Sequence, residues 1–185
     1  MAMLDTVVQG VCLSIFSNVL AQIIDAYQKN TSYTNINLTP ILQFVTYTIL
    51  NTPINIVWQD LLESWFPSSQ PAAEIAKSNE KPTVAAKKQG LSIQNTLAKF
   101  ALDQSLGALI NIPLFIGIMG MLKGQGVDQI VNTVKADFWD IYTSGAKLWP
   151  AVSLISFAAI PPNKRVIFGS IAGVVWNVYL SLKSR

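Results

Sequence analysis

The sequence has 185 residues, a net charge of +3 and only 12% charged residues, with no histidine and a single cysteine, Cys12. These counts exclude an intrachain disulfide, a Ser-His-Asp or Cys-His nucleophile and any histidine-based metal site. The basic residues are too few and too scattered to form a nucleic-acid-binding surface.

Charge is absent from long stretches of the chain, whereas a soluble domain has roughly 25% charged residues. The stretches are Thr6–Ile24, Asn30–Gln59, Gln104–Leu122, Leu148–Asn163 and Val166–Leu182. A helix that spans a bilayer needs about 20 mostly apolar residues, within a range of about 17–25, and three of the stretches reach that length. We therefore predict an all-α integral membrane bundle that forms one domain over residues 1–185.

The first half of the chain is predicted to contain two helices and a loop. The first helix covers Leu4–Tyr27, and the second starts near Pro40, a favourable first-turn residue, and runs to about Trp65. Residues 67–90 are rich in Pro, Ser, Ala, Lys and Glu. Such a segment cannot bury much apolar area, so we expect a flexible solvated loop between two helical halves.

A long third helix is expected to begin at the N-cap residue Ser92 and to run through Met121. Pro113 should bend it, because proline removes one backbone hydrogen bond and clashes with the preceding turn. Gly124 and Gly126 are expected to end it.

The segment Val127–Gly145 has a different pattern, because its apolar residues recur at helical spacing on one face while its charged residues lie mostly elsewhere. This pattern favours an amphipathic helix that lies along the membrane interface. The alternative is a core helix of a soluble cap.

Two further apolar segments, Leu148–Ile160 and Val166–Leu182, complete the chain, with Pro161–Arg165 between them. The two prolines end or kink the preceding helix, and the cations Lys164 and Arg165 should seek water or phosphate. The last two segments are either a short hairpin or one bent element, and length alone does not decide between these.

Polar side chains in the apolar segments recur three, four, seven or eight positions apart, which places them on one face of each helix. An amide or hydroxyl that faces lipid without a partner costs on the order of several kcal/mol, so these faces should meet each other or face water. The first arrangement stabilises a bundle and the second lines an aqueous path. The candidates for this pore or interhelical polar face are Asn18, Gln22, Asn51, Asn55, Asp103, Gln104 and Asn111.

Asp103 lies at the membrane end of the third helix's charge-free run, where a charge costs less than at a helix centre. It is either a selectivity or gating charge, or a structural group bonded to a neighbouring helix or to water. Close helix approach is expected at the GxxxG patterns Gly120–Gly124 and Gly169–Gly173, of which the second is the better candidate because it lies within an apolar run.

Several motifs of the second half stand at fixed distances from one another. Asp103-Gln104 is followed by Pro113, and Trp149-Pro150 is followed by Phe157, Pro161, Arg165 and Trp176-Asn177-Val178-Tyr179-Leu180-Ser181. These motifs resemble the Mpv-seventeen / 22-kDa peroxisomal membrane protein family, most specifically from Lys147 to Ser181. Pro53, Trp58 and Leu62 match the family's Gly-Pro-x-x-His-x-Trp-Tyr-x-x-Leu signature, from which Thr52, Ile56 and Gln59 depart.

The resemblance implies about four spanning helices in the peroxisomal membrane or the mitochondrial inner membrane, channel-like passage of small solutes, and no enzymatic activity. Arg165 is expected to fix the geometry of the final element, and it could also bind lipid phosphate or accept Asp103 as a partner. The motif residues that the resemblance assigns to structure are Pro53, Trp58, Pro113, Trp149, Pro150, Pro161, Arg165, Trp176 and Asn177.

We predict a passive, channel-like pore for small metabolites that works without cofactor or metal. Its partners would be the lipid bilayer and small-molecule solutes, with self-association into a homo-oligomer left open and no nucleic acid. The alternative is a non-transporting membrane organiser that self-associates or recruits partners through its loops. A membrane enzyme would need a convergent set of titratable groups, which the sequence does not show.

Overall fold

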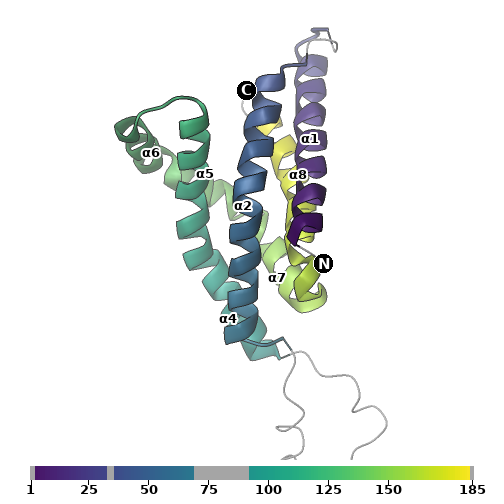
Figure 1. The fold of residues 1–185 in the computed structure, drawn as a ribbon, viewed down its shortest axis with the longest axis vertical. Coiled ribbons are helices and arrows are strands. Elements are labelled where there is room, and N and C mark those ends of the chain that lie inside the picture. The colour runs from purple at the N-terminus through teal and green to yellow at the C-terminus, as the bar shows by residue number, and fades with distance from the viewer. Residues whose placement is uncertain (1–2, 33–35, 69–91, 184–185) are drawn as a thin grey trace, which may run out of the picture.

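The computed structural model describes residues 3–32, 36–68 and 92–183, so the loop expected at residues 67–90 lies almost wholly outside the described residues. All regular structure in the described part is helical, which confirms the all-α prediction (Figure 1). The elements are α1 Met3–Gln28, α2 Leu38–Trp65, α4 Ile93–Leu102, the π-helical turn η2 Asp103–Gly107, α5 Ala108–Leu122, α6 Val127–Gly145, α7 Trp149–Ala159, the 3-10 turn η3 Pro162–Lys164 and α8 Arg165–Lys183.

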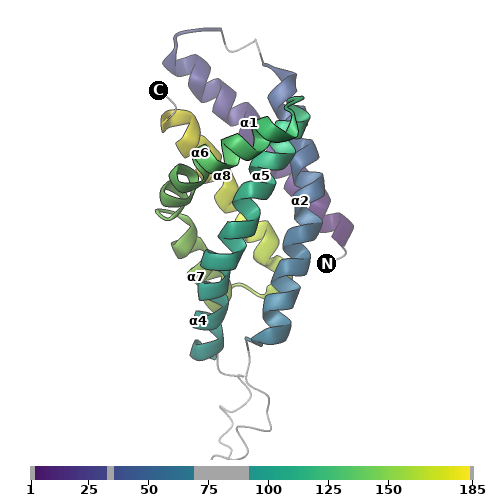
Figure 2. The same ribbon diagram turned by 90° about the vertical axis from the view of Figure 1, so that its left-hand side faces the viewer.

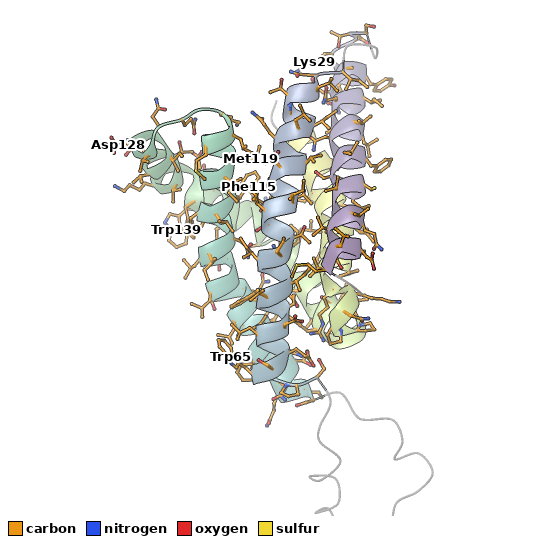
Figure 3. All side chains as sticks on the ribbon, viewed as in Figure 1. Lys29, Trp65, Phe115, Met119, Asp128 and Trp139 are labelled. Atoms are coloured by element: carbon orange, nitrogen blue, oxygen red, sulfur yellow. The ribbon has the colours of Figure 1, made fainter. Side chains whose placement is uncertain are left out.

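The helices form a bundle in which α1 packs along both α2 and α8 (Figures 1 and 2). α5 lies on the other side of α2, where the Phe115 ring meets the ring of Tyr47 at 5.2 Å between centroids (Figure 3). α4, which precedes α5 in the same long helical stretch, packs against α7. α6 crosses one end of α5 (Figure 2).

The bundle is apolar outside and largely polar inside. Many large hydrophobic side chains are exposed, among them Leu4, Val8, Phe16, Leu109, Ile110 and Val175. The buried residues include Thr6, Ser17, Asn18, Thr52, Thr96, Ser153 and Ser156. Such a distribution fits a chain whose outer surface is solvated by lipid, where polar groups must find partners inside the protein.

Two helical stretches of the described part are long and apolar enough to cross a bilayer. They are Met3–Gln28, with 26 residues, and Ile93–Leu122, with 30 residues. The second combines α4, η2 and α5, and Asp103 lies within it.

The predicted ends of the third helix are confirmed. Ser92 caps its start, because the Oγ atom accepts a hydrogen bond from the backbone N–H of Asn95. Gly124 follows its end with a φ of +74°, a conformation that favours glycine. α5 runs through Pro113 as continuous α-helix, and the change in helical hydrogen bonding lies earlier, at Asp103–Gly107.

The end of the chain is a hairpin, so the structure decides between the two arrangements left open by length. α7 begins with Pro150 in its first turn, Pro161 lies between the helices, and α8 returns alongside α7. The rings of Trp149, at the start of α7, and Trp176, far along α8, lie 6.4 Å apart. Antiparallel helices bring exactly such distant positions together.

The two GxxxG patterns differ from our expectation. At Gly120 a Cβ atom would lie 2.7 Å from Ile130 Cγ1 of α6, so this glycine permits a close helix approach. At Gly169 and Gly173 no described atom lies within 4 Å of such a Cβ. The close approach within the monomer is therefore at Gly120, because α6 folds back onto α5 at that position.

Candidate functional site

Asp103 is the centre of a polar contact between three helices. Its Oδ1 atom accepts a hydrogen bond from Trp58 Nε1 of α2 at 3.0 Å. Its Oδ2 atom accepts from Ser153 Oγ of α7 at 2.7 Å, and from Gln104 Nε2 at 3.3 Å. We call Trp58, Asp103 and Ser153 the Asp103 layer.

The π-helical turn at Asp103–Gly107 positions this layer. A π-turn adds a residue to the helical turn and often occurs at functional sites. Gly107 closes it, and a Cβ there would lie 3.4 Å from both Asp103 Oδ1 and Trp58 Nε1. A small residue at this position therefore lets the indole of Trp58 lie against the helix and reach the carboxylate.

A cavity of about 140 Å³ adjoins the layer between α2 and η2–α5. Trp58 and Gly107 belong to both the cavity wall and the surroundings of Asp103. Ile54 and Ile110 also line the cavity, and they are 43% and 52% exposed, so it borders the outer apolar surface. The remaining lining residues are the amides Asn55 and Asn111.

A second polar cluster contains two buried cations and one carboxylate. Glu63 Oε2 accepts hydrogen bonds from Lys99 Nζ and Arg165 Nη1, each at 2.7 Å. The backbone N–H and the hydroxyl of Ser68 also donate to the Glu63 carboxylate, at 2.6 and 2.8 Å. Ser68 Oγ in turn accepts from Lys99 at 2.6 Å and from Arg165 Nη2 at 2.8 Å.

Both cations of this cluster lie over the ring of Phe157, with Lys99 Nζ 5.5 Å and Arg165 Cζ 5.1 Å from its centroid. The Lys99 and Arg165 side chains are 0% and 1% exposed, whereas Glu63 is 24% exposed. We call Glu63, Ser68, Lys99, Phe157 and Arg165 the Glu63 layer. It ties the end of α2 to α4, α7 and α8.

The predicted amides mostly find partners within their own helices. Asn18, Asn55 and Asn111 each donate to the carbonyl four residues earlier, at 3.1, 3.1 and 2.9 Å. Gln22 exchanges two hydrogen bonds with the backbone of Asn37, before α2. Our expectation that these groups must meet another helix or water was therefore too narrow, because an amide can also bond to its own helix backbone.

Asn51 and Gln104 complete the predicted set. Gln104 donates to Asp103, so the structure brings these two candidates together. Asn51 Oδ1 is buried with no hydrogen-bond partner among the described atoms. The predicted polar face is therefore divided, with Asp103 and Gln104 in one interhelical site and Asn55 and Asn111 in the wall of the adjoining cavity.

The expectation that Arg165 binds lipid phosphate or pairs with Asp103 was wrong. Its guanidinium is buried and bonds to Glu63, Ser68 and the carbonyl of Ile160. Glu63 and Lys99 were missed because both lie outside the charge-free stretches, where an ionic residue is expected to be solvated. One sequence signal could have identified Lys99. It lies four residues before Asp103, and this spacing places both side chains on one helix face.

The other motif residues lie at structural positions. Pro53 and Trp58 are within α2 and Pro113 is within α5. Asn177 lies in α8, but its side chain is outside the described residues. Over the ranges that the structure describes, no three acidic or cysteine side chains gather as metal ligands would.

The apolar exterior, the two membrane-length helical stretches and the polar layers inside the bundle define an α-helical membrane protein. Comparison with known proteins gives the family. The model of the Mpv17 / PMP22 family matches residues 120–181, which confirms the resemblance to this family over the last part of the chain. No solved structure matches the chain.

Curated relatives match between about half and nine-tenths of the chain. Protein SYM1 of Yarrowia lipolytica is 36% identical over 88 residues, which are 48% of this chain and 44% of the relative. Mitochondrial inner membrane protein Mpv17 of Caenorhabditis briggsae is 33% identical over 88 residues, covering 48% and 49%. Peroxisomal membrane protein 2 of Bos taurus is 26% identical over 171 residues, covering 91% and 76%.

The chain thus spans about half the length of the Yarrowia and Caenorhabditis relatives. The relatives' names place them in the mitochondrial inner membrane and in the peroxisomal membrane. The protein is accordingly an organelle membrane protein of one of these two membranes.

Proposed function

We propose that the protein is a passive, weakly selective pore for small polar metabolites, with Asp103 at its narrow point. One observation carries this proposal. An ionisable residue lies inside a stretch that is apolar enough to cross a membrane, bonded to two other helices and next to a cavity. Ionisable residues within membrane-spanning segments are rare and tend to mark solute paths, even near a segment end, where the cost of a charge is smaller than at the centre.

The proposed membrane arrangement has four principal spanning elements, namely α1, α2, the stretch Ile93–Leu122, and α8. At 1.5 Å per residue, the 28 residues of α2 extend about 42 Å and the 19 of α8 about 28 Å, against a hydrocarbon core of about 30 Å. α6 would lie along the interface, where its exposed Trp139 (Figure 3) suits the headgroup level.

The described conformation corresponds to a closed pore. The hydrogen bonds from Trp58 and Ser153 hold the carboxylate of Asp103 across the interface of α2 and α7. Trp58 lines the cavity and bonds to Asp103, so a solute that moved from the cavity towards Asp103 would have to displace this indole. The open lining of the cavity is almost wholly apolar, and the amides of Asn55 and Asn111 bond to their own helices, so these amides would have to turn before they could bind such a solute. This role needs no catalytic step and no cofactor.

The test is conductance of the purified protein in planar bilayers, together with release of graded small solutes from liposomes. We expect a conductance with a preference for cations, and we expect Asp103→Asn to reduce that preference. Asp128→Asn is the matched control, because Asp128 lies exposed in the first turn of α6 and should leave selectivity unchanged. Folded protein that conducts nothing and releases nothing would overturn the pore and favour the non-transporting organiser.

A further inference from the structure

We propose that Glu63 is a positioning residue for the Asp103 layer. By binding Lys99, Glu63 prevents this cation from pairing with Asp103. The Asp103 layer therefore keeps its negative charge. The consequence for selectivity rests on the pore proposed above, whereas the pairing itself can be tested without any conductance.

The two layers are stacked one helical turn apart, on the same helices. Lys99 and Asp103 are four residues apart in the long third helix, and the backbone N–H of Asp103 bonds to the carbonyl of Lys99. Their partners on α7 are also four residues apart, since Lys99 lies over Phe157 and Asp103 bonds to Ser153. Both side chains therefore lie on the side of the long helix that faces α7, and their backbones are one helical turn apart.

The charges of the two layers are unequally distributed. The Glu63 layer holds two buried cations and one carboxylate. Within the part of the chain that the structure describes, the Asp103 carboxylate accepts hydrogen bonds from the neutral side chains of Trp58, Ser153 and Gln104. The Glu63 layer thus has an excess of positive charge, and it lies beside the negative charge of Asp103, which is bound by neutral donors.

Loss of the charge on Glu63 would change this balance. A buried cation without a carboxylate is costly, and Lys99 has a flexible four-carbon stem on which its ammonium can turn. Oppositely charged side chains four residues apart on a helix attract each other. Arg165 is more firmly held, because it also bonds to the carbonyl of Ile160. Lys99 is therefore the cation that would move to Asp103, and the pairing would neutralise the Asp103 layer.

The selectivity test compares three proteins in planar bilayers under a potassium chloride gradient. We expect the ratio of cation to anion permeability to fall towards unity in Glu63→Gln. In Glu63→Gln/Lys99→Met the ratio should return to the wild-type value, because the freed cation is gone. Because Lys99→Met also removes a buried cation that lacks a carboxylate, the coupling to Asp103 described next separates the pairing from a merely structural role of Glu63. An unchanged ratio in Glu63→Gln, or no recovery in the double variant, overturns the proposal.

A second measurement does not depend on conductance. Thermal unfolding in detergent would compare the effect of Asp103→Asn in the wild type and in Glu63→Gln. We expect the substitution to lower the midpoint by about 2–4 °C more in the Glu63→Gln background, because Asp103 then pairs with Lys99. An equal effect in both backgrounds would refute the pairing, even if the protein is a pore. If the protein does not conduct, but Asp103→Asn still lowers the midpoint more in the Glu63→Gln background, only the pore is refuted and the pairing stands.

Glu63→Gln could also fail to fold, and this outcome is decisive too. Folding that is restored by adding Lys99→Met would identify an unpaired Lys99 as the cause and would overturn the proposal, because Lys99 would then not have paired with Asp103. Folding that is not restored would overturn it.

Discussion

The indole Nε1 of Trp58 donates a hydrogen bond of 3.0 Å to Asp103 Oδ1, across 45 positions of the sequence. This bond joins the tryptophan of one family motif to the aspartate of another. It also crosses from α2 to the π-turn η2, so it fixes the register between two long helices. Because the indole is a neutral donor, the carboxylate is held without losing its charge.

Replacement of Trp58 by phenylalanine should therefore destabilise the bundle and loosen the proposed closed state. The ring is kept, but the carboxylate loses a donor, and a hydrogen bond to a charged group contributes about 1.5–3 kcal/mol. We expect the free energy of unfolding to fall by about this amount, as measured by thermal or denaturant unfolding in detergent. Open-channel events should become more frequent.

Trp139→Phe is the matched control for this variant. Trp139 is 66% exposed on α6, and its ring contacts only its helix neighbours Phe138 and Tyr142 among the ring contacts that the described residues make. The control should leave both the unfolding midpoint and the conductance unchanged. Equal effects of the two substitutions would show that the Trp58 hydrogen bond contributes nothing.

Removal of the Arg165 charge should be among the most destabilising substitutions in the chain. Arg165→Met leaves Glu63 with one cation fewer and removes the bonds to Ser68 and Ile160. Breaking a buried ion pair costs about 3–5 kcal/mol. Unfolding in detergent should show the loss, whereas Lys164→Met, at the exposed neighbouring position, should change stability little. A tolerated Arg165→Met would contradict the importance of the Glu63 layer.

The helices could be predicted because their signals are local. A glycine and a change of periodicity mark the ends of the predicted helix Val127–Gly145, and α6 has the same bounds. Ser92 marks a helix start because its hydroxyl accepts a hydrogen bond from the backbone. Gly124 marks a helix end because glycine readily adopts a positive φ. The hairpin at Pro161 could not be settled in this way, because two prolines permit both a turn and a kink.

The partners of the polar residues could be predicted only in part. Helical spacing placed Asp103 and the amides on helix faces, but it did not show that Asn55 and Asn111 bond to their own backbones. Periodicity also says nothing of which distant residue lies opposite. Glu63 meets Arg165 across 102 positions of sequence, and only the packing of α2 against the α7–α8 hairpin determines that contact.

The amides and the hydroxyl of Ser153 should therefore respond differently to substitution. Asn111→Leu removes a bond within one helix and should change the free energy of unfolding by about 0.5 kcal/mol or less. Ser153→Ala removes an interhelical bond to a carboxylate and should cost about 1.5–3 kcal/mol. Thermal unfolding of both variants in the same detergent is the measurement. If Asn111→Leu proved the more costly change, the amide would have an interhelical role that its bond to Gly107 does not explain.

The contact between α5 and α6 depends on the absence of a side chain at Gly120. A Cβ atom there would lie 2.7 Å from Ile130 Cγ1 and 2.8 Å from Gln125 Oε1, distances at which these side chains or the helices that carry them must move. Overpacking of this kind typically costs about 1–3 kcal/mol. We expect Gly120→Ala to lower the unfolding midpoint and to increase proteolysis in the α5–α6 connection.

Two variants make this prediction specific. Gly117→Ala places the same methyl group on α5 where no described atom lies within 4 Å, so it should be neutral or stabilising, because alanine favours the helix by about 1 kcal/mol over glycine. Ile130→Ala removes the atoms that clash and should restore part of the stability lost in Gly120→Ala. If Gly120→Ala behaved like Gly117→Ala, α6 would not pack on α5 as described, and its placement along the membrane interface would lose its anchor.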